Sequence, residues 1–540
     1  MERGDRVQIK ISGWLAAKRG AQIVEGDVRA VTEKAVQVMD EWFPRSQIEE
    51  VEYLEREEDR VGRAREIKHA SGLPDPPKTV YPPWDHQRRA YHIVAQQKSV
   101  LLDMWMGTGK TKVVIDVIQN TAPTKNWRTL VVAPRTVIED VWPGQVEEHC
   151  VDGCHLVLLN KGNARKHKEM SKEAWGLDGP VMYLVNYESV WREPFAGWVK
   201  ARSWDFIVAD ESHAIKSPGS KCSRFMGTLR KRTDHRIALT GTPMPHSPLD
   251  VYGQARFVDP SVFGTSFARF RSRYAVMGGY GGHEVIGYPI DERDRYYHPE
   301  IAEEWNRGLE RLMFSVGEEV LDLPESVDVH RRLPLAGEGR KYYDQMERDL
   351  IVDIGEGVIT AQNALSRLLR LQQITSGYLP VETETGRLRP HRVDDTKERM
   401  LEELLDGLGP EEPVVVFARF RHDLDVIHQV STALGRNSVE LSGRRHELPL
   451  WQEEQVPILA AQIQAGGVGI DLTRARYCVY YSQGFSLGNY QQSRARVHRP
   501  GQERSVFYYH LTLRDTIDEI VLRSLKAKQN TIESVLRHLT

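Results

Sequence analysis

Short apolar runs alternate with longer amphipathic segments along most of the chain. Five such runs fall in the first half, at Ser99–Leu102, Thr129–Val132, Val181–Val185, Phe206–Val208 and Ile237–Leu239. Four more fall in the last third, at Val414–Phe417, Pro457–Ala460, Tyr477–Tyr481 and Val506–His510. Runs of this length bounded by polar residues are typical of strands that are buried on both faces of a parallel sheet. Since helical stretches separate the runs, the pattern predicts βαβ units and an α/β fold with two parallel-sheet lobes.

The first residues follow a different pattern. Val7, Ile9 and Ile11 alternate with polar residues, which is typical of a half-buried strand, and the segment predicts a small, barrel-like β-rich domain. Its role stays open between a packing module and a module that binds DNA or a partner. Beyond it, the changes in composition predict these divisions: a β-rich domain at 1–50, a charged helical connector and Pro-rich linker at 51–74, a first lobe at 75–262, a helical insertion or protrusion at 263–395, and a second lobe with a C-terminal helix at 396–540.

Composition excludes several classes of protein. The 540 residues carry a net charge of −3, so the overall charge indicates neither nucleic acid nor an anionic membrane as a partner. A local basic surface is still compatible with this total. Four cysteines are too few for a disulfide scaffold and fit a reducing compartment. No apolar run approaches the roughly 18 residues of a membrane span, and the first residues lack a signal-peptide core. We therefore expect a cytoplasmic protein with no membrane contact.

The clearest chemical signal is the segment MGTGKT at Met106–Thr111, between the run that ends at Leu102 and a helix-compatible segment. Strand, Gly-containing loop and helix are the context of a phosphate-binding loop, because glycine lets backbone N–H groups turn toward phosphate oxygens at a helix N-terminus. Lys110 would contact the β- and γ-phosphates, and the hydroxyl of Thr111 would ligate Mg²⁺. The full motif would have glycine at position 104, where this chain has Met104.

An acidic pair follows the run Phe206–Val208. Asp210 and Glu211 come directly after it, where α/β sheets place their ligands. We expect Asp210 to hold Mg²⁺ and Glu211 to orient and deprotonate an attacking water. A carboxylate that merely caps the next helix is the alternative for such a pair on its own.

A cationic segment near the end, QQSRARVHRPGQ, supplies a charge for phosphoryl transfer. Arg496 and Arg499 are spaced to share one helix face and to bind one anion as forks. A basic surface helix is the alternative for such a stretch taken alone.

Taken in order, these motifs resemble the Swi/Snf-like ATPases of helicase superfamily two, in particular the short bacterial, phage and annealing-helicase-like forms. The resemblance runs from about residue 80 to 535 and rests on nine segments in sequence: PPWDHQ with Gln87, MGTGKT, VVAPRTVIEDVW from 131, NYES from 186, DESH from 210, LTGTP from 239, VVVFARF from 414, AGGVGIDLT from 465 and QSRARVHRPGQ from 492. It implies two RecA-like lobes that share one ATP site, with ATP and Mg²⁺ as cofactors and DNA as the partner, duplex favoured and bound largely without sequence preference.

The resemblance also implies roles for individual residues. Gln87 would read the adenine edge while Tyr81 or Trp84 packs on the ring. The loop residues Gly107, Thr108 and Gly109 would surround the phosphates. In the second lobe, the residues expected at the nucleotide are Gly469, Asp471 and Gln492, with Arg496 and Arg499 as arginine fingers.

A second group is expected to serve the nucleic acid. Thr240 and Thr242 would couple it to the nucleotide, and Arg135, Thr136 and Arg419 would contact its backbone, with Arg444 and Arg445 as weaker candidates and surface charge as the alternative for each arginine.

The chain departs from the family pattern at three places: Asp471 replaces a common Asn, Phe485–Leu487 replaces a Trp-Asn-Pro segment, and Phe314–Gly317 replaces a basic stretch. These departures argue against nucleosome remodelling and leave the hydrolytic residues intact. Three functions follow as hypotheses: a duplex DNA translocase, a strand-separating or strand-annealing helicase, and a nucleotide-binding scaffold without turnover.

One weaker pattern suggests a metal. His149, Cys150, Cys154 and His155 lie close together, but two His beside the cysteines on one short turn would strain a tetrahedral site. We therefore expect no structural zinc. Protein partners are not indicated by the sequence.

Overall fold

The computed structural model describes the strand segments 6–11, 23–31, 35–38, 41–44 and 48–55, residue 63, and residues 65–536 except 161, 280, 281, 283, 356–360, 383–387, 454 and 465–469. The chain forms two compact units, one of residues 1–320 with 532–540 and one of residues 321–531. The expected region 263–395 is therefore divided, since its first part belongs to one unit and the rest to the other. Among the described residues, no helix combines the length and apolar character that a membrane span needs.

Five N-terminal strands form an antiparallel sheet with the order β4-β3-β2-β1-β5. They are β1 (Arg6–Ile11), β2 (Ile23–Val31), β3 (Ala35–Val38), β4 (Glu41–Pro44) and β5 (Ile48–Glu55). The sheet confirms the β-rich expectation for this segment, but β5 continues five residues past the boundary expected at residue 50. The reason is a period-two alternation within the charged stretch, because Val51 pairs with Ile9 and Tyr53 with Val7 across the sheet.

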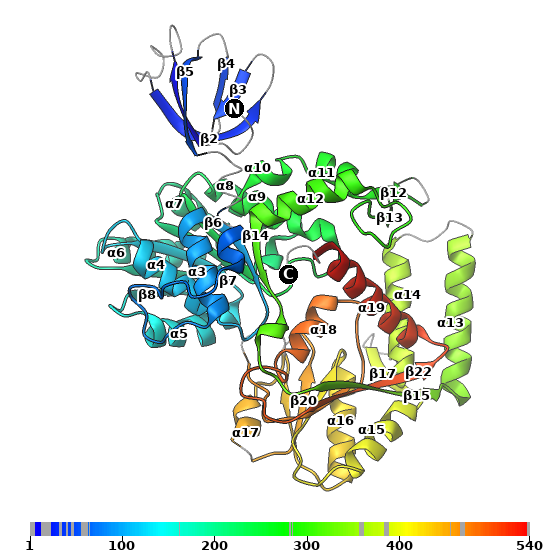
Figure 1. Ribbon diagram of the computed structural model, residues 1–540. Helices are drawn as coiled ribbons and strands as arrows, with labels where there is room; N and C mark the ends of the chain where they lie inside the picture. Colours follow the sequence, from blue (N-terminus) through cyan, green and yellow to red (C-terminus); the bar gives the residue numbers. More distant parts are fainter. Residues whose placement is uncertain are drawn as a thin grey trace. The chain divides into compact units, whose positions relative to one another are not determined.

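The first unit is built on a seven-stranded sheet in which every neighbouring pair is parallel (Figure 1). In sheet order the strands are β14 (Met313–Val316), β6 (Ser99–Met104), β11 (His235–Thr240), β10 (Phe206–Asp210), β7 (Arg128–Ala133), β9 (Val181–Asn186) and β8 (His155–Leu159). The strands β7, β9 and β10 are buried at every position, as expected for a sheet covered on both faces. All five predicted strands of this half are confirmed.

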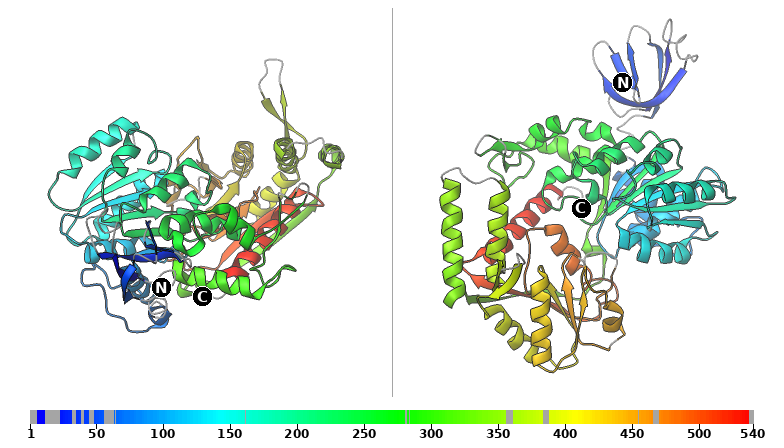
Figure 2. Two further views of the ribbon diagram at one scale, coloured as in Figure 1. Left: turned by 90° about the horizontal axis from the view of Figure 1, so that it is seen from above. Right: turned by 180° about the vertical axis from the view of Figure 1, so that it is seen from behind.

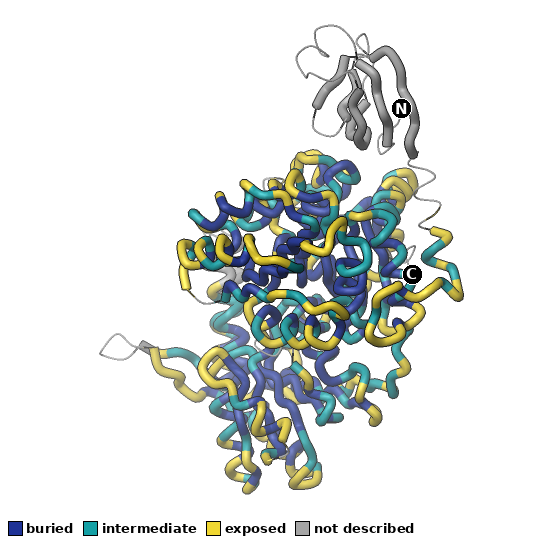
Figure 3. Tube along the Cα trace, turned by 90° about the vertical axis from the view of Figure 1, so that its left-hand side faces the viewer, coloured by how far each residue is buried: buried dark blue, intermediate teal, exposed yellow. Residues whose placement is uncertain are grey.

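Helices and short turns connect these strands. They are α3 (Asp85–Gln97), α4 (Lys110–Thr121), the π-helical turn η2 (Val137–Val141), α5 (Trp142–His149), α6 (Ala164–Trp175), α7 (Phe195–Lys200), the 3-10 turn η3 (Ser212–Ile215), α8 (Lys221–Leu229), the 3-10 turn η4 (Pro248–Asp250), α9 (Val251–Val258), α10 (Pro260–Phe263), α11 (Phe267–Tyr274) and α12 (Pro299–Leu312), with a hairpin of β12 (Val276–Gly278) and β13 (Glu284–Gly287). Figure 3 shows the buried residues gathered in the interior.

The second unit contains a six-stranded sheet, again with parallel neighbours. Its order is β15 (Ser326–Pro334), β22 (Val506–Arg514), β21 (Tyr477–Tyr480), β18 (Val414–Ala418), β20 (Ile458–Gln462) and β19 (Ser438–Leu441). The predicted strands of this half are confirmed. Two parallel sheets, each with connecting helices, confirm the expectation of two RecA-like lobes.

The helices of the second unit include a long pair, α13 (Gly337–Gly355) and α14 (Ala361–Thr375), which lie side by side (Figures 1 and 2). The others are α15 (Thr396–Asp406), α16 (Arg421–Ala433), α17 (Leu448–Gln452), α18 (Leu487–Arg494) and α19 (Ile517–Leu536), the end of which belongs to the first unit, and a hairpin is formed by β16 (Tyr378–Glu382) and β17 (Leu388–Arg392).

Four edge strands of the two parallel sheets were not predicted: β8, β14, β15 and β19. Two of them, β14 and β15, lie in the region expected to be helical. β14 begins at the residue after α12 ends, so no turn residue marks it. β15 carries Asp328, His330 and Arg331 and is only partly buried, so it lacks the apolar run of a central strand. Each strand exists because a parallel neighbour supplies its hydrogen-bond partners, β6 for β14 and β22 for β15.

Candidate nucleotide site

The loop between β6 and α4 turns sharply at two glycines. Gly107 has φ 85° and Gly109 has φ 82°, a region that favours glycine over residues with a Cβ atom. Gly109 also caps α4, a helix of 12 residues. The first N–H groups of a helix lack partners within it, and the helix dipole favours an anion there. The local backbone is therefore that of a phosphate-binding loop, as the sequence predicts.

The ammonium group of Lys110 lies against this loop. Nζ donates to Met104 O at 2.6 Å and to Trp105 O at 3.2 Å. A phosphate oxygen carries charge and is a stronger acceptor than a neutral carbonyl, so Lys110 is placed to exchange these contacts for the phosphates of a nucleotide. Thr111 follows in the first turn of α4 and is half-buried.

The side chain of Gln87 connects the start of α3 to the same loop through hydrogen bonds. Its Oε1 accepts from Trp84 N at 3.0 Å, and its Nε2 donates to Thr108 O at 3.0 Å. A Cβ atom on Gly109 would lie 2.3 Å from Gln87 Nε2, so glycine is required for this approach. Tyr81 is 52% exposed and Trp84 is 49% exposed, which leaves both residues open to a ligand.

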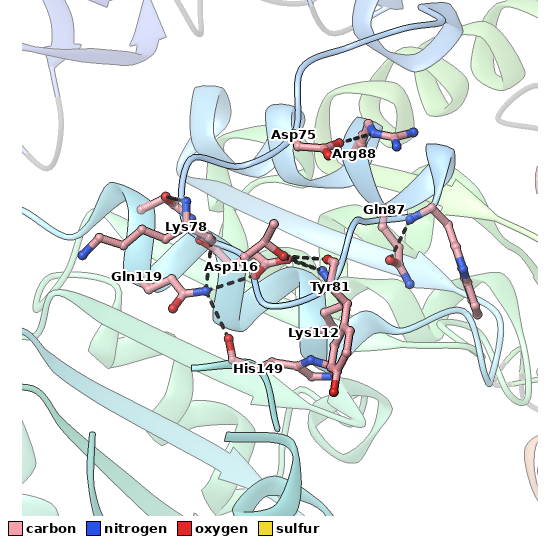
Figure 4. Close-up of polar contacts among 12 residues, drawn as sticks. Asp75, Lys78, Tyr81, Gln87, Arg88, Lys112, Asp116, Gln119 and His149 are labelled. Carbon is pink, nitrogen blue, oxygen red and sulfur yellow. Dashed lines mark hydrogen bonds and ion pairs between the residues drawn. The ribbon is translucent and has the colours of Figure 1, made fainter. Parts of the chain in front are cut away.

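The segment that carries Tyr81 is held by α4, the helix that begins at the loop (Figure 4). Gln119 Nε2 donates to Lys78 O at 3.2 Å and to Asp116 Oδ1 at 3.1 Å. Lys112 Nζ lies 2.5 Å from Asp116 Oδ2 in a buried ion pair. The aromatic segment and the phosphate loop are thus positioned by opposite ends of one helix.

Asp210 ends β10, and hydrogen bonds fix both of its carboxylate oxygens. Oδ2 accepts from Trp142 Nε1 at 2.9 Å, and Oδ1 accepts from Glu211 N at 2.9 Å. The hydroxyl of Tyr187 donates to Asp210 O at 2.7 Å, so the backbone is held as well. Burial and the adjacent Glu211 raise the pKa of Asp210 to about 6, although the Trp142 hydrogen bond and Lys110 oppose that rise.

Glu211 adopts a left-handed backbone with φ 50°. Such a conformation is uncommon for a residue with a Cβ atom and is held by its surroundings. Its Oε2 is buried, lies 3.4 Å from His213 Nδ1, and makes no hydrogen bond among the described residues. Burial lowers the pKa of His213 to about 4, so its imidazole is neutral at pH 7. A buried carboxylate oxygen with spare acceptor capacity suits an acceptor for the proton of a water.

The threonines of LTGTP lie beside this acidic segment. Thr240 Oγ1 accepts from Thr242 N at 3.0 Å and lies 3.5 Å from His213 Nδ1. A second bridge runs through Gln254 on α9: its Oε1 accepts from Ser212 Oγ at 2.7 Å, and its Nε2 donates to the carbonyl of residue 243 at 2.6 Å. The acidic motif and the threonine motif are therefore joined twice.

The second unit brings together several of its expected residues. Arg499 NH1 donates to Ile470 O at 3.2 Å and lies 3.8 Å from Asp471 Oδ2, and Leu472 N donates to Arg496 O at 3.0 Å. The last motif therefore packs against the segment that begins at residue 470. Gln492 is buried at the end of α18. Gly469 lies outside the described residues.

The expectation that Arg496 and Arg499 share a helix face is wrong. α18 ends at Arg494, and both arginines lie in the turns that follow, Arg496 buried and Arg499 half-buried. The turns are built by Val497 N, which donates to Arg494 O at 3.0 Å. Pro500 has no N–H and disfavours the helical region at Arg499, so a regular helix could not run on through the second arginine.

The candidates for nucleic-acid contact differ in their surroundings. Arg135 is exposed and forms an ion pair with Glu139 at 2.8 Å, and Thr136 lies beside it. Arg419 is half-buried, and its NH1 donates to Gln372 Oε1. Arg444 Nε donates to Glu440 Oε1 at 2.8 Å, so its guanidinium is held by a neighbouring carboxylate.

Four residues of the site were not predicted: Trp142, Gln254, Gln502 and Asp103. Trp142 and Gln254 hold the acidic motif as described above. Gln502 Nε2 donates to Thr473 O at 3.0 Å and to Ala475 O at 2.8 Å, so it ties the last motif to the preceding one. Asp103 is buried on β6, where burial raises its pKa to about 7 and Ser315 Oγ donates to it at 3.1 Å. Trp142 ends the segment VVAPRTVIEDVW and Gln502 ends the segment QSRARVHRPGQ. Because the family resemblance rests on these segments, the sequence could have identified both residues.

The first unit fits a nucleotide with a divalent cation on the observations above. The glycine loop has the backbone for phosphates, and the buried acceptor atoms of Asp210 and Glu211 lie in one acidic segment. Oxygen ligands are the ones that Mg²⁺ prefers, and it keeps several waters. Thr111 and Asp210 are the side chains with suitable oxygens.

Comparison with known families gives two matches. The model of the SNF2-related domain matches residues 42–377, and the model of the helicase conserved C-terminal domain matches residues 396–501. The two matches follow one another along the chain and together account for most of it.

Similar proteins come from phages and eukaryotes. Protein p41 of Acyrthosiphon pisum secondary endosymbiont phage 1 is 27% identical over 446 residues, which is 78% of this chain and 91% of the phage protein. The chromodomain-helicase-DNA-binding protein 1-like of Danio rerio is 26% identical over 82% of this chain and 42% of its own length. The ATP-dependent DNA helicase DDM1 of Arabidopsis thaliana is 23% identical over 78% of this chain and 57% of its own length. The chain thus spans nearly all of the phage protein and about half of the two eukaryotic ones.

Among solved structures, the SWI2/SNF2 ATPase core of Sulfolobus solfataricus in complex with dsDNA aligns with 21% identity and a TM-score of 0.41. The alignment covers 87% of this chain and 97% of that one.

Proposed function

This chain belongs to the SNF2-related domain family, and we propose that it hydrolyses ATP to move along double-stranded DNA. The observation that carries the proposal is the pairing, within one unit, of a glycine loop that ends in Lys110 with the buried carboxylates of Asp210 and Glu211. Phosphoryl transfer needs little covalent chemistry from the protein and depends on positioning and charge. The residues of this unit supply both.

In the proposed site, the phosphates lie on the loop residues Gly107, Thr108 and Gly109, and Lys110 neutralises the β- and γ-phosphates. The adenine edge is read by Gln87, whose Oε1 and Nε2 each retain capacity for a further hydrogen bond. The exposed ring of Tyr81 or of Trp84 packs on the base. Thr111 and Asp210 would hold a Mg²⁺ ion, which would neutralise charge on the phosphate oxygens.

Glu211 serves as the base in this proposal. Its buried Oε2 accepts a hydrogen bond from the water that attacks the γ-phosphate and takes up the proton. The imidazole of His213 beside it is neutral, so it forms no ion pair with this carboxylate. Thr240, Thr242 and Gln254 then transmit a change in the acidic segment to the threonine motif.

The second unit supplies the remaining positive charge. We assign Arg496 and Arg499 as arginine fingers and place Gly469, Asp471 and Gln492 near the nucleotide. A finger is worth about 10³–10⁵ in rate in well-studied nucleotide hydrolases. If the fingers engage with ATP and withdraw after hydrolysis, closure and chemistry are tied together.

DNA contact in this proposal is made by Arg135 and Thr136 from one unit and Arg419 from the other. Contacts to phosphates carry no sequence information, so binding should be largely independent of sequence and sensitive to salt. The names of two relatives mention DNA, and they support DNA as the polymer. Alternating grip by two units moves a protein along a duplex without separating its strands.

The test is the ATPase rate of the full chain with duplex DNA, single-stranded DNA, RNA or no nucleic acid at one salt concentration. We expect duplex DNA to stimulate most. Triplex displacement without strand displacement would support translocation, whereas strand displacement would favour a helicase. No hydrolysis under any condition would overturn the proposal in favour of a nucleotide-binding scaffold.

A further inference from the structure

A chain of polar side chains runs through the second unit from β18 to α18. Six residues from six different segments form it, and we call them the polar chain: Arg419, Gln372, Gln483, His510, Asp328 and Arg494. Its first member is a residue assigned above to nucleic acid. Its last member ends the helix that carries Gln492 and precedes Arg496.

The first half of the polar chain has fixed donors and acceptors. Arg419 NH1 donates to Gln372 Oε1, and Gln372 Nε2 donates to Gln483 O at 3.0 Å. Gln372, on α14, is only 5% exposed. The backbone of Arg419 is held separately, since its N donates to Ser482 Oγ at 2.8 Å. A shift of the guanidinium therefore acts on Gln372 without unfolding the strand end.

The second half depends on a single tautomer of His510. Gln483 Nε2 lies 3.3 Å from His510 Nδ1, and His510 Nε2 lies 2.8 Å from Asp328 Oδ1. An amide nitrogen can only donate and a carboxylate can only accept, so Nδ1 is the acceptor and Nε2 carries the proton. Burial lowers the pKa of His510, which favours this neutral form. His510 is 2% exposed, and its ring lies between those of Tyr480 and His330. The distance between ring centroids is 5.1 Å to Tyr480 and 4.8 Å to His330.

The end of the polar chain fixes the turn that carries the fingers. Arg494 NH1 donates to the same Asp328 Oδ1 at 2.5 Å, and its guanidinium lies 3.8 Å from the ring centre of Tyr508. The carbonyl of Arg494 accepts from Val497 N and from His498 N, both at 3.0 Å. The turn that contains Arg496 is therefore built directly on Arg494.

Gln372 and His510 are the buried members of the polar chain, whereas the side chain of Asp328 is 40% exposed. A buried polar group is costly unless it is satisfied. Apolar side chains would fill the same space between strand and helix without that cost.

The hydrogen bonds run without a break from Arg419 to Asp328, which also accepts from Arg494. Because the two ends are separate functional groups, this continuity points to coupling rather than packing. Among the described residues, the neighbouring ring of His330 stacks on His510 and makes no hydrogen bond.

We propose that the polar chain links the position of Arg419 to that of the turn at Arg494–Arg499, so that nucleic-acid contact at one end sets the fingers at the other. His510 and Gln372 are positioning residues in this proposal, since neither touches nucleotide or nucleic acid. The inference rests on the proposed function, which supplies the roles of the two ends.

The test replaces each of the two stacked histidines, His510 and His330, by phenylalanine in separate variants. His510→Phe keeps an aromatic ring but removes both hydrogen bonds of the polar chain, whereas His330→Phe removes none that the structure shows among the described residues. For each variant, the measurements are the ATPase kcat with and without saturating duplex DNA, the DNA concentration at half stimulation, and the melting temperature.

We expect His510→Phe to lower the stimulation of kcat by DNA at least about 5-fold, the lower end of allosteric couplings. The kcat without DNA and the DNA concentration at half stimulation should stay within about 2-fold of the wild-type values, a factor well below the range of allosteric couplings. His330→Phe should behave as the wild type. Equal stimulation in His510→Phe and wild type would overturn the proposal, as would an equal loss in both variants.

A second variant tests whether the residues act as one unit. Gln372→Met interrupts the polar chain at its other end, and residues of one network are non-additive. The double variant Gln372→Met/His510→Phe should therefore lose no more stimulation than the more affected single variant. Multiplied losses would overturn the proposal and indicate separate structural effects. A wild type that hydrolyses ATP without any stimulation by nucleic acid would instead contradict the proposed function.

Discussion

The indole N–H of Trp142 donates to Asp210 Oδ2 at 2.9 Å, from a helix 68 residues earlier in the chain. Trp142 is fully buried, so the hydrogen bond is shielded from water and holds one rotamer of the carboxylate. It also opposes the effect of burial on the pKa of Asp210. Trp142 thus holds the orientation of the expected metal ligand and favours its charged form.

Trp142→Phe should weaken the dependence of ATPase on Mg²⁺ without unfolding the protein. The ring is kept and the donor is lost, and partners of metal ligands typically contribute about 10–100-fold in affinity or activity. The measurement is ATPase rate against Mg²⁺ concentration. Trp305→Phe is the matched control, because that indole is equally buried and its Nε1 makes no hydrogen bond among the described residues. Identical Mg²⁺ curves for both variants would show that Trp142 only fills space.

The ATPase activity should fall as the pH drops through about 6. Burial and Glu211 raise the pKa of Asp210 to about 6, so protons compete with the cation for this carboxylate. A higher Mg²⁺ concentration should move the midpoint of the acid limb to lower pH, because the cation favours the charged form. The check is a set of pH profiles at two Mg²⁺ concentrations. If the midpoint of the acid limb did not change with Mg²⁺ concentration, the loss of activity would belong to the titration of another group.

Asp103 should make the first unit more stable in mild acid than at neutral pH. Burial raises its pKa from 3.8 to about 7, so the folded state binds the proton more tightly than the unfolded chain. This contribution is fully present below about pH 4 and is lost as the pH rises through 7. Between those limits, each tenfold fall in proton concentration lowers the free energy of unfolding by about 1.4 kcal/mol at most.

Asp103→Asn removes the titration and can keep an acceptor for Ser315 Oγ. The free energy of unfolding of the variant should therefore exceed that of the wild type near pH 8 and change less between pH 4 and 8. Chemical denaturation across that range measures both. Parallel curves for the two proteins would contradict the raised pKa.

Lys110→Ala and Arg499→Ala should each abolish ATPase activity and leave the melting temperature largely unchanged. Both remove a cation from the phosphates, and an arginine finger alone is worth about 10³–10⁵ in rate. Arg504→Ala serves as the control, since this arginine lies nearby in the sequence and is 44% exposed. An Arg499 variant with a normal rate of hydrolysis would contradict the role of the second unit.

Gly109→Ala should abolish nucleotide binding, whereas Gly72→Ala should not. Both glycines have positive φ, 82° and 71°, so both substitutions strain the backbone. At Gly109 the new methyl group would also lie 2.3 Å from Gln87 Nε2, while nothing lies within 4 Å at Gly72. Binding of a fluorescent ATP analogue distinguishes the two. Equal binding would show that the Gln87 contact does not shape the loop.

The central strands of both sheets and the phosphate loop were predictable from the sequence. A strand such as Val414–Ala418 is buried on both faces, so its apolar run predicts the strand without information about its neighbours. The loop was predictable for a similar reason, because its backbone needs glycine at particular positions. Edge strands such as β15 were not predictable, since a charged segment becomes a strand only when a neighbour pairs with it.

By itself, the sequence determined which residues carry charge, where the glycines of the expected phosphate loop lie and in which order the motifs come, because those properties are local. Tertiary structure alone decided that Trp142 faces Asp210 and that Gln254 joins two motifs. These contacts depend on how strands are ordered in a sheet. That ordering brings residues far apart in sequence within hydrogen-bond distance, and no periodicity along the chain records it.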